Sequence, residues 1–174
     1  MLTQIAEGIW RRAGNGRRLA IVAGVHGDER AGIVAVRALL DPQHSIWSRV
    51  SAEVTLVVAN LEAVEAGHRS VDSEDMNRLF GRAAQTATGA IVACIQNALE
   101  GVEHVLDLHE TSCDSEPLAV CEASGPHLAA VARLGLKTIV ADAPRVLGPG
   151  MLSAWVDRHG GCGITVEVGR NGTS

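Results

Sequence analysis

The chain has 174 residues, of which 47% are hydrophobic and 20% are charged, so it can bury a sizeable core without disulfides or metals as staples. Aromatic residues make up only 2% of the chain, and 15 basic against 20 acidic residues give a net charge of −5. These values exclude an aromatic platform for base stacking and a basic surface for nucleic acid.

Short apolar runs alternate along the chain with segments of helical period. We predict strands at residues 19–25, 54–59, 105–108, 118–121, 137–141 and 163–168. Helices are predicted at residues 29–40, 83–99, 126–134 and 150–158, and residues 60–82 are predicted as a long polar loop. This alternation indicates a three-layer α/β fold with a largely parallel sheet.

No segment indicates a membrane or an oxidising compartment. The apolar runs, residues 91–95 among them, are too short to span a bilayer, and the first residues lack the pattern of a signal peptide. The four cysteines form no C-x-x-C pair, which favours reduced, buried thiols. We therefore predict a cytoplasmic protein with neither a membrane nor a nucleic-acid partner. The sequence is compatible with a homo-oligomer as well as with a monomer.

Polar residues that suit a metal ion stand at the ends of two predicted strands. His26 and Glu29 lie three residues apart at a strand-to-helix turn, and His109 ends the strand around residue 107. The carboxyl ends of strands in an open α/β sheet meet at one edge, where ligands bind. Two imidazoles and a carboxylate match a catalytic zinc site with an open position for water. The His26–Glu29 pair alone favours a capping acid beside a surface histidine, and adding His109 reverses that preference toward the metal site.

The predicted polar loop and the last strand carry further candidates. Arg69, Asn77 and Arg78 suit the recognition of a carboxylate, because guanidinium groups bind carboxylates through two parallel hydrogen bonds. Among so many acids they also fit a solvated face of ion pairs. Glu167 stands in an otherwise apolar strand, where a raised pKa would suit a general acid or base. It fits a solvent-facing carboxylate at a strand end equally well.

Five segments in this order make the sequence resemble the succinylglutamate desuccinylase/aspartoacylase family of zinc-dependent amidohydrolases, relatives of the zinc carboxypeptidases. The segments are residues 24–29, 60–63 with Arg69, 75–80, 107–109 and 164–169. The resemblance implies a three-layer, zinc-carboxypeptidase-like (phosphorylase/hydrolase-like) domain with a mixed, mainly parallel central sheet. Family members usually have Pro where this chain has Leu61, which removes no ligand.

By that resemblance, His26, Glu29 and His109 bind one zinc ion per chain. Glu167 corresponds to the catalytic glutamate. Arg69 stabilises the oxyanion and, with Asn77 and Arg78, binds the substrate. The implied reaction is hydrolysis of the amide bond of an N-acyl amino acid or a similar small carboxylated amide. We expect a single catalytic domain, residues 1–174, with the family's C-terminal β-rich domain absent or truncated.

Two other functions fit the same residues. A zinc carboxypeptidase acting on short peptides would use Asn77 and Arg78 for the free C-terminal carboxylate. A non-catalytic module that binds metal or carboxylates would keep the ligands without hydrolysing any amide. Hydrolysis of N-acyl amino acids compared with dipeptides separates these alternatives.

Overall fold

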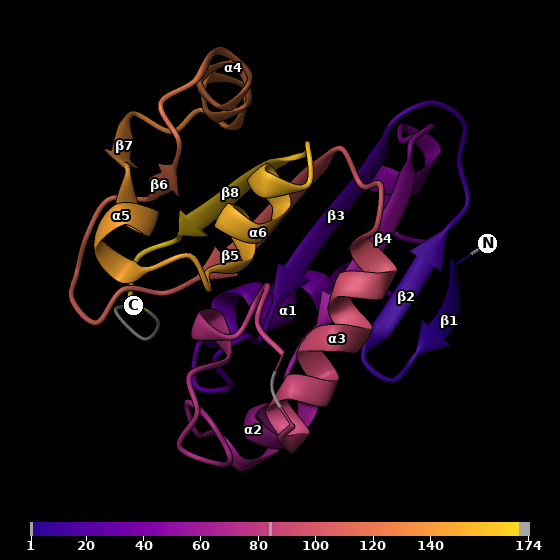
Figure 1. Ribbon diagram of the computed structural model, residues 1–174. Coiled ribbons are helices and arrows are strands. Elements are labelled where there is room, and N and C mark those ends of the chain that lie inside the picture. The colour runs from indigo at the N-terminus through magenta and orange to yellow at the C-terminus, as the bar shows by residue number, and fades with distance from the viewer. Residues whose placement is uncertain (1, 84, 171–174) are drawn as a thin grey trace.

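The computed structural model describes residues 2–83 and 85–170, whose eight strands form one mixed sheet between two layers of helices (Figure 1). The strands are β1 (Leu2–Ala6), β2 (Ile9–Arg12), β3 (Arg18–Ala23), β4 (Glu53–Val58), β5 (His104–His109), β6 (Leu118–Cys121), β7 (Thr138–Ala141) and β8 (Cys162–Glu167). The predicted three-layer α/β fold is confirmed. Residues 1, 84 and 171–174, which fall within the predicted domain, lie outside the described residues, as does part of the predicted helix 83–99.

The predicted helices are present, with additions, but the one predicted at residues 83–99 begins at Ala87. They are α1 (Arg30–Leu39), α2 (Leu61–Ala66), α3 (Ala87–Leu99), α4 (Gly125–Leu134), α5 (Ala143–Leu147), α6 (Leu152–Arg158) and the 3-10 turns η1 (Ser45–Ser48) and η2 (Met76–Arg78). None of the helices in the described part of the chain is long and apolar enough to cross a membrane.

The prediction of a continuous loop at residues 60–82 is wrong, because this segment contains α2 and η2. The Asn60 side chain caps α2 by accepting a hydrogen bond from the Ala63 amide at 3.2 Å. A helix of six residues shows too few turns for its period to be visible in a sequence. Side-chain capping, rather than an apolar stripe, therefore marks where α2 begins.

The sheet order β1-β2-β4-β3-β5-β8-β6-β7 puts parallel strands at its centre. β3 pairs in parallel with β4 and β5, and β5 pairs in parallel with β8. β6 also pairs in parallel with β7, whereas antiparallel pairs join β1 to β2, β2 to β4 and β6 to β8. The expected mixed, mainly parallel central sheet is confirmed. The N-terminal hairpin β1–β2 was not predicted, because β1 is a mostly exposed edge strand without an apolar run.

The helices cover the sheet from both sides. α3 and α6 pack on one face, where Val22, Val105 and Trp155 belong to the same buried cluster (Figure 1). α1 and α4 pack on the opposite face, where they contribute Ile33 and Val131 to two further clusters. This arrangement holds β3, β4, β5 and β8 side by side, so that the residues after their carboxyl ends meet at one edge.

The turn after β3 depends on two glycines. Gly24 has a φ of 70°, which side chains with a Cβ rarely adopt. A Cβ on Gly27 would lie 2.2 Å from the carbonyl carbon of Ala63, so only glycine lets this turn approach α2. The turn consequently carries His26 and Glu29 to the carboxyl edge of β5.

Candidate metal centre

Three side chains from two strand ends converge on one point. His26 follows β3, Glu29 is the N-cap residue of α1, and His109 ends β5. One donor atom from each lies within 4.8 Å of the other two. His26 Nδ1 lies 2.7 Å from Glu29 Oε1, and His109 Nδ1 lies 2.9 Å from Glu29 Oε2. The two rings meet edge to face, with centroids 5.0 Å apart.

Each histidine has its second ring nitrogen bound to another carboxylate. His26 Nε2 lies 3.1 Å from Asp75 Oδ1, and His109 Nε2 lies 2.9 Å from Asp107 Oδ2. Both Nδ1 atoms therefore face the centre of the cluster. Metal-binding histidines ordinarily have this arrangement, in which an outer carboxylate fixes the ring and makes it a better ligand. Neither Asp75 nor Asp107 was assigned a role from the sequence.

The electrostatics of the cluster follow from these contacts. Burial lowers the pKa of His26, but the hydrogen bonds to Asp75 and Glu29 outweigh it and raise that pKa. Burial likewise opposes a rise in the pKa of His109, yet the charge of Asp107 and the bonds to Asp107 and Glu29 raise it well above its usual value. The surrounding carboxylates thus favour positive charge at this point.

The pKa values of the carboxylates Glu29 and Asp75 are lowered, whereas those of the two histidines are raised. Burial raises the pKa of Glu29, but its hydrogen bonds to His109 and His26 hold it well below the usual range. The bond to His26 lowers the pKa of Asp75 to about 2. Both groups stay ionised at neutral pH and present negative charge to a cation. Two imidazoles and a buried carboxylate are a donor set that fits zinc.

Glu29 is held by a neighbour that sequence reasoning missed. Its Oε2 accepts a hydrogen bond from the Glu110 amide at 3.1 Å, and the Glu110 side chain in turn accepts one from the Ala31 amide at the start of α1. This reciprocal pair joins the end of β5 to the start of α1. The sequence pattern does not predict this pair of hydrogen bonds, because Glu110 stands in a polar turn.

Glu167 lies beside the cluster on the next strand. β5 and β8 run in parallel with His109 opposite Glu167. The carboxylate oxygen Oε2 of Glu167 is buried and has no hydrogen-bond partner among the described residues. Burial is the main cause of its raised pKa, which the positive charge of His109 partly offsets. A buried, unpaired carboxylate oxygen is able to take up a proton.

The predicted substrate-binding residues lie on one side of the cluster. Arg69 Nη1 is 3.2 Å from Glu29 Oε1, and its side chain is 55% exposed. Arg78 reaches to within 3.8 Å of Asp75 Oδ2. Arg69 thus borders the candidate ligand Glu29, Arg78 borders the outer carboxylate of Asp75, and both side chains are partly exposed to solvent.

Asn77 has a structural role that was not foreseen. Its side-chain oxygen is buried and accepts a hydrogen bond from the Leu152 amide at 2.9 Å, at the first residue of α6. This bond joins η2 to α6. A contact with substrate is therefore left to the side-chain nitrogen alone.

Comparison with known proteins identifies a family for this chain. The family described as "Succinylglutamate desuccinylase/Aspartoacylase catalytic domain" matches residues 15–174. The chain belongs to this family. Over 75 residues it is 36% identical to the succinylglutamate desuccinylase of Pseudomonas paraeruginosa, a match that covers 43% of this chain and 22% of that protein.

Solved structures share the fold. The succinylglutamate desuccinylase of Chromobacterium violaceum superposes with a TM-score of 0.77 at 22% identity, over 98% of this chain and 62% of that one. A metallo-carboxypeptidase from Burkholderia cenocepacia superposes with a TM-score of 0.74 at 13% identity, over 92% of this chain and 51% of that one. The carboxypeptidase-like fold is thereby confirmed. The chain spans about three fifths of the length of the Chromobacterium protein.

Proposed function

We propose that this chain is a zinc-dependent amidohydrolase that splits the amide bond of an N-acyl amino acid or a similar small carboxylated amide. The observation that carries the proposal is the position of Glu167. Glu167 stands opposite His109 in the β5–β8 ladder, beside the cluster of His26, Glu29 and His109, and its buried Oε2 has no hydrogen-bond partner within the described part of the chain. Membership in the desuccinylase/aspartoacylase family supports the same reaction class.

His26, Glu29 and His109 are the residues that hold the metal. A zinc ion held there would supply a water of lowered pKa and a Lewis acid for the scissile carbonyl. Asp75 and Asp107 orient the two imidazoles through their Nε2 atoms. Zinc as the metal and the cytoplasm as the location both stay predictions.

Glu167 acts as the general base and then as the general acid. Its Oε2 takes a proton from the attacking water and delivers it to the amine nitrogen as the carbon–nitrogen bond breaks. A raised pKa suits both roles, because the carboxylate then binds a proton more readily and still releases it. The products are a carboxylic acid and an amine or amino acid.

Arg69 and Arg78 each bind a different negatively charged group of the substrate. Arg69, beside Glu29, stabilises the oxyanion that develops on the scissile carbonyl. Arg78, together with the side-chain nitrogen of Asn77, binds the substrate carboxylate and so orients the amide. Both guanidinium groups are accessible from solvent, as a substrate requires.

Metal content tests the ligand assignment. We expect the purified chain to carry close to one zinc per chain by plasma mass spectrometry, and the His26→Ala/His109→Ala variant to carry none. As a control, His68→Ala/His159→Ala removes two exposed histidines outside the cluster and should leave the zinc in place. A chain that binds no zinc even when zinc is supplied would contradict the assignment.

A substrate panel tests the reaction. The zinc-loaded chain should hydrolyse N-acetyl-aspartate or N-succinyl-glutamate faster than dipeptides. A preference for dipeptides would instead favour a carboxypeptidase. This alternative is consistent with the fold that the chain shares with the Burkholderia metallo-carboxypeptidase. Zinc binding without hydrolysis of any amide would identify a non-catalytic metal-binding module.

A further inference from the structure

One face of the central sheet is only partly covered. Along β5, Val105, Asp107 and His109 are buried on the face beneath α3 and α6, whereas His104 and Leu106 on the other face are half-exposed. Parallel strands are ordinarily covered on both faces. Between α1 and α4 the floor of the sheet therefore lies open.

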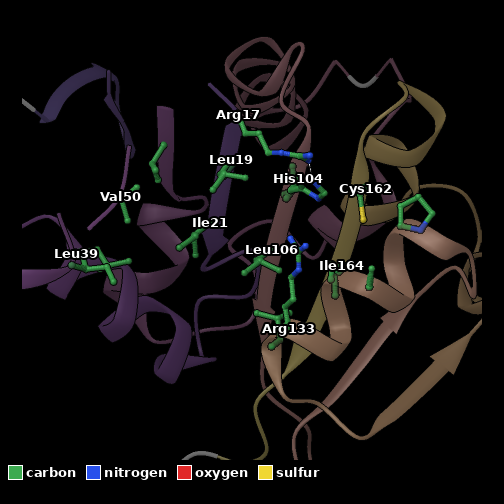
Figure 2. Close-up of a pocket in the computed structure, with 18 of the residues that line it drawn as sticks. Arg17, Leu19, Ile21, Leu39, Val50, His104, Leu106, Arg133, Cys162 and Ile164 are labelled. Carbon is green, nitrogen blue, oxygen red and sulfur yellow. Dashed lines mark hydrogen bonds between the residues drawn. The ribbon is translucent and has the colours of Figure 1, made fainter. Parts of the chain in front are cut away.

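This opening is a groove of about 600 Å³, within the range of small-molecule sites. Its floor is made by the first halves of β3, β5 and β8, and includes Leu19 and Leu106 (Figure 2). Trp47, in η1, lines one side, and Ala129 and Ala130 of α4 line the other. The lining is mostly aliphatic, so an apolar chain placed there would leave water.

Basic side chains lie within this apolar groove. Arg17 Nη1 donates a hydrogen bond to His104 Nε2 at 3.1 Å, and also lies 3.7 Å from Glu103 at the surface. Arg133, on α4, makes no hydrogen bond or ion pair with the described residues. In Figure 2 its guanidinium is directed along the groove toward His104. An unpaired guanidinium beside apolar walls is a ready partner for a carboxylate.

We propose that this groove binds a medium-chain monocarboxylate, an aliphatic chain with one carboxylate head. The alkyl chain lies on Leu19 and Leu106, and the carboxylate binds Arg133, with Arg17 and His104 next to it.

The groove is separate from the candidate metal centre. It lies at the amino ends of β3, β5 and β8, whereas the metal ligands follow the carboxyl ends. Leu106 and His109 also point to opposite faces of the sheet, because they stand three positions apart in one strand. Carboxylate binding is consequently independent of the proposed hydrolysis, and it can be measured on the chain with or without metal.

Calorimetric titration of the intact chain tests this inference. Decanoate should bind with 1:1 stoichiometry, whereas decyltrimethylammonium and acetate should not, since each lacks either the negative head or the apolar chain. Arg133→Gln should raise the Kd for decanoate about tenfold or more, the loss expected for a charge-assisted bidentate pair. Arg37→Gln, on exposed α1 surface outside the groove, should leave it unchanged.

A second pair of variants tests the location. Ala129→Trp places a large ring in the groove from an exposed position of α4 and should abolish binding, while Ala132→Trp, exposed on the same helix but outside the groove, should not. Circular dichroism should show both variants folded. Equal binding of the cationic amphiphile, or an unchanged Kd in Arg133→Gln, would overturn the proposal. So would a chain that ignores decanoate and forms dimers that Ala129→Trp breaks, which would make the groove a protein interface.

Discussion

Replacing Glu167 with Gln should lower kcat by about 10²- to 10⁴-fold, the usual contribution of a general base, and leave zinc bound. The amide has nearly the shape of the carboxylate, but it cannot take up a proton from water. Glu167 is not among the three residues whose donor atoms converge within 4.8 Å, so removing its charge leaves the metal ligands in place. The measurement is kcat on the best substrate of the panel, together with zinc content.

A folding readout separates this effect from damage to the protein. Because burial raises the folded pKa of Glu167, its ionisation opposes folding as pH rises above the unfolded value of 4.5. The neutral amide avoids that cost, so the melting temperature of the metal-free Glu167→Gln chain at pH 7 should equal or exceed that of the parent. Glu122→Gln, at an exposed glutamate after β6, is the matched control and should retain normal kcat. A Glu167→Gln enzyme of near-normal rate would rule out the assigned role.

The positions of the candidate ligands could be predicted because buried strands leave a clear trace in a sequence. The apolar runs of β3, β5 and β8 stop at polar residues, and those residues lie at the edge where parallel strands end. His26, His109 and Glu167 were all found in this way. Parallel pairing then fixes the register, in which His109 faces Glu167.

The contacts that cross between distant segments could not be predicted. Asp75 lies in a polar stretch with acids and arginines on both sides, and only the fold shows that it reaches His26, 49 residues away. The same stretch hides η2 and the bond from Asn77 to the first residue of α6. Such pairings depend on how loops pack, and loops have no hydrophobic period to reveal it.

The partly open face of the sheet between α1 and α4 could not be predicted from the sequence either. Leu19 and Leu106 read as ordinary core residues, since a continuous apolar run predicts a strand covered on both faces. The structure leaves them half-exposed, because α1 and α4 do not cover the groove between them. A sequence pattern shows which residues are apolar, whereas the positions of the covering helices decide which of them meet solvent.

The role of Asp107 could have been predicted from its spacing to His109. It stands two positions before His109 in a strand, so both side chains point to the same face. The structure shows it 0% exposed, with one oxygen on His109 and the other without a partner among the described residues. A buried carboxylate bound to a candidate ligand calls for a test of its own.

Replacing Asp107 with Asn should weaken zinc binding by about 10- to 100-fold, as found for outer carboxylates that orient metal-binding histidines. The amide oxygen can still accept the bond from His109 Nε2, so the ring keeps its place while the negative charge that strengthens its donor atom is lost. Zinc affinity is measured by competition with a chelator of known strength. Asp28→Asn, at an exposed aspartate next to Glu29, is the control and should leave the affinity unchanged.

The two substitutions should fail in opposite ways, and this contrast tests the site as a whole. Excess zinc should restore most of the activity of Asp107→Asn, because the defect lies in occupancy of the centre. Excess zinc should restore none of the activity of Glu167→Gln, whose centre is already filled. If zinc rescued both variants, Glu167 would belong to the metal-binding set instead of acting on the proton. If it rescued neither, Asp107 would take part in the reaction beyond its bond to His109.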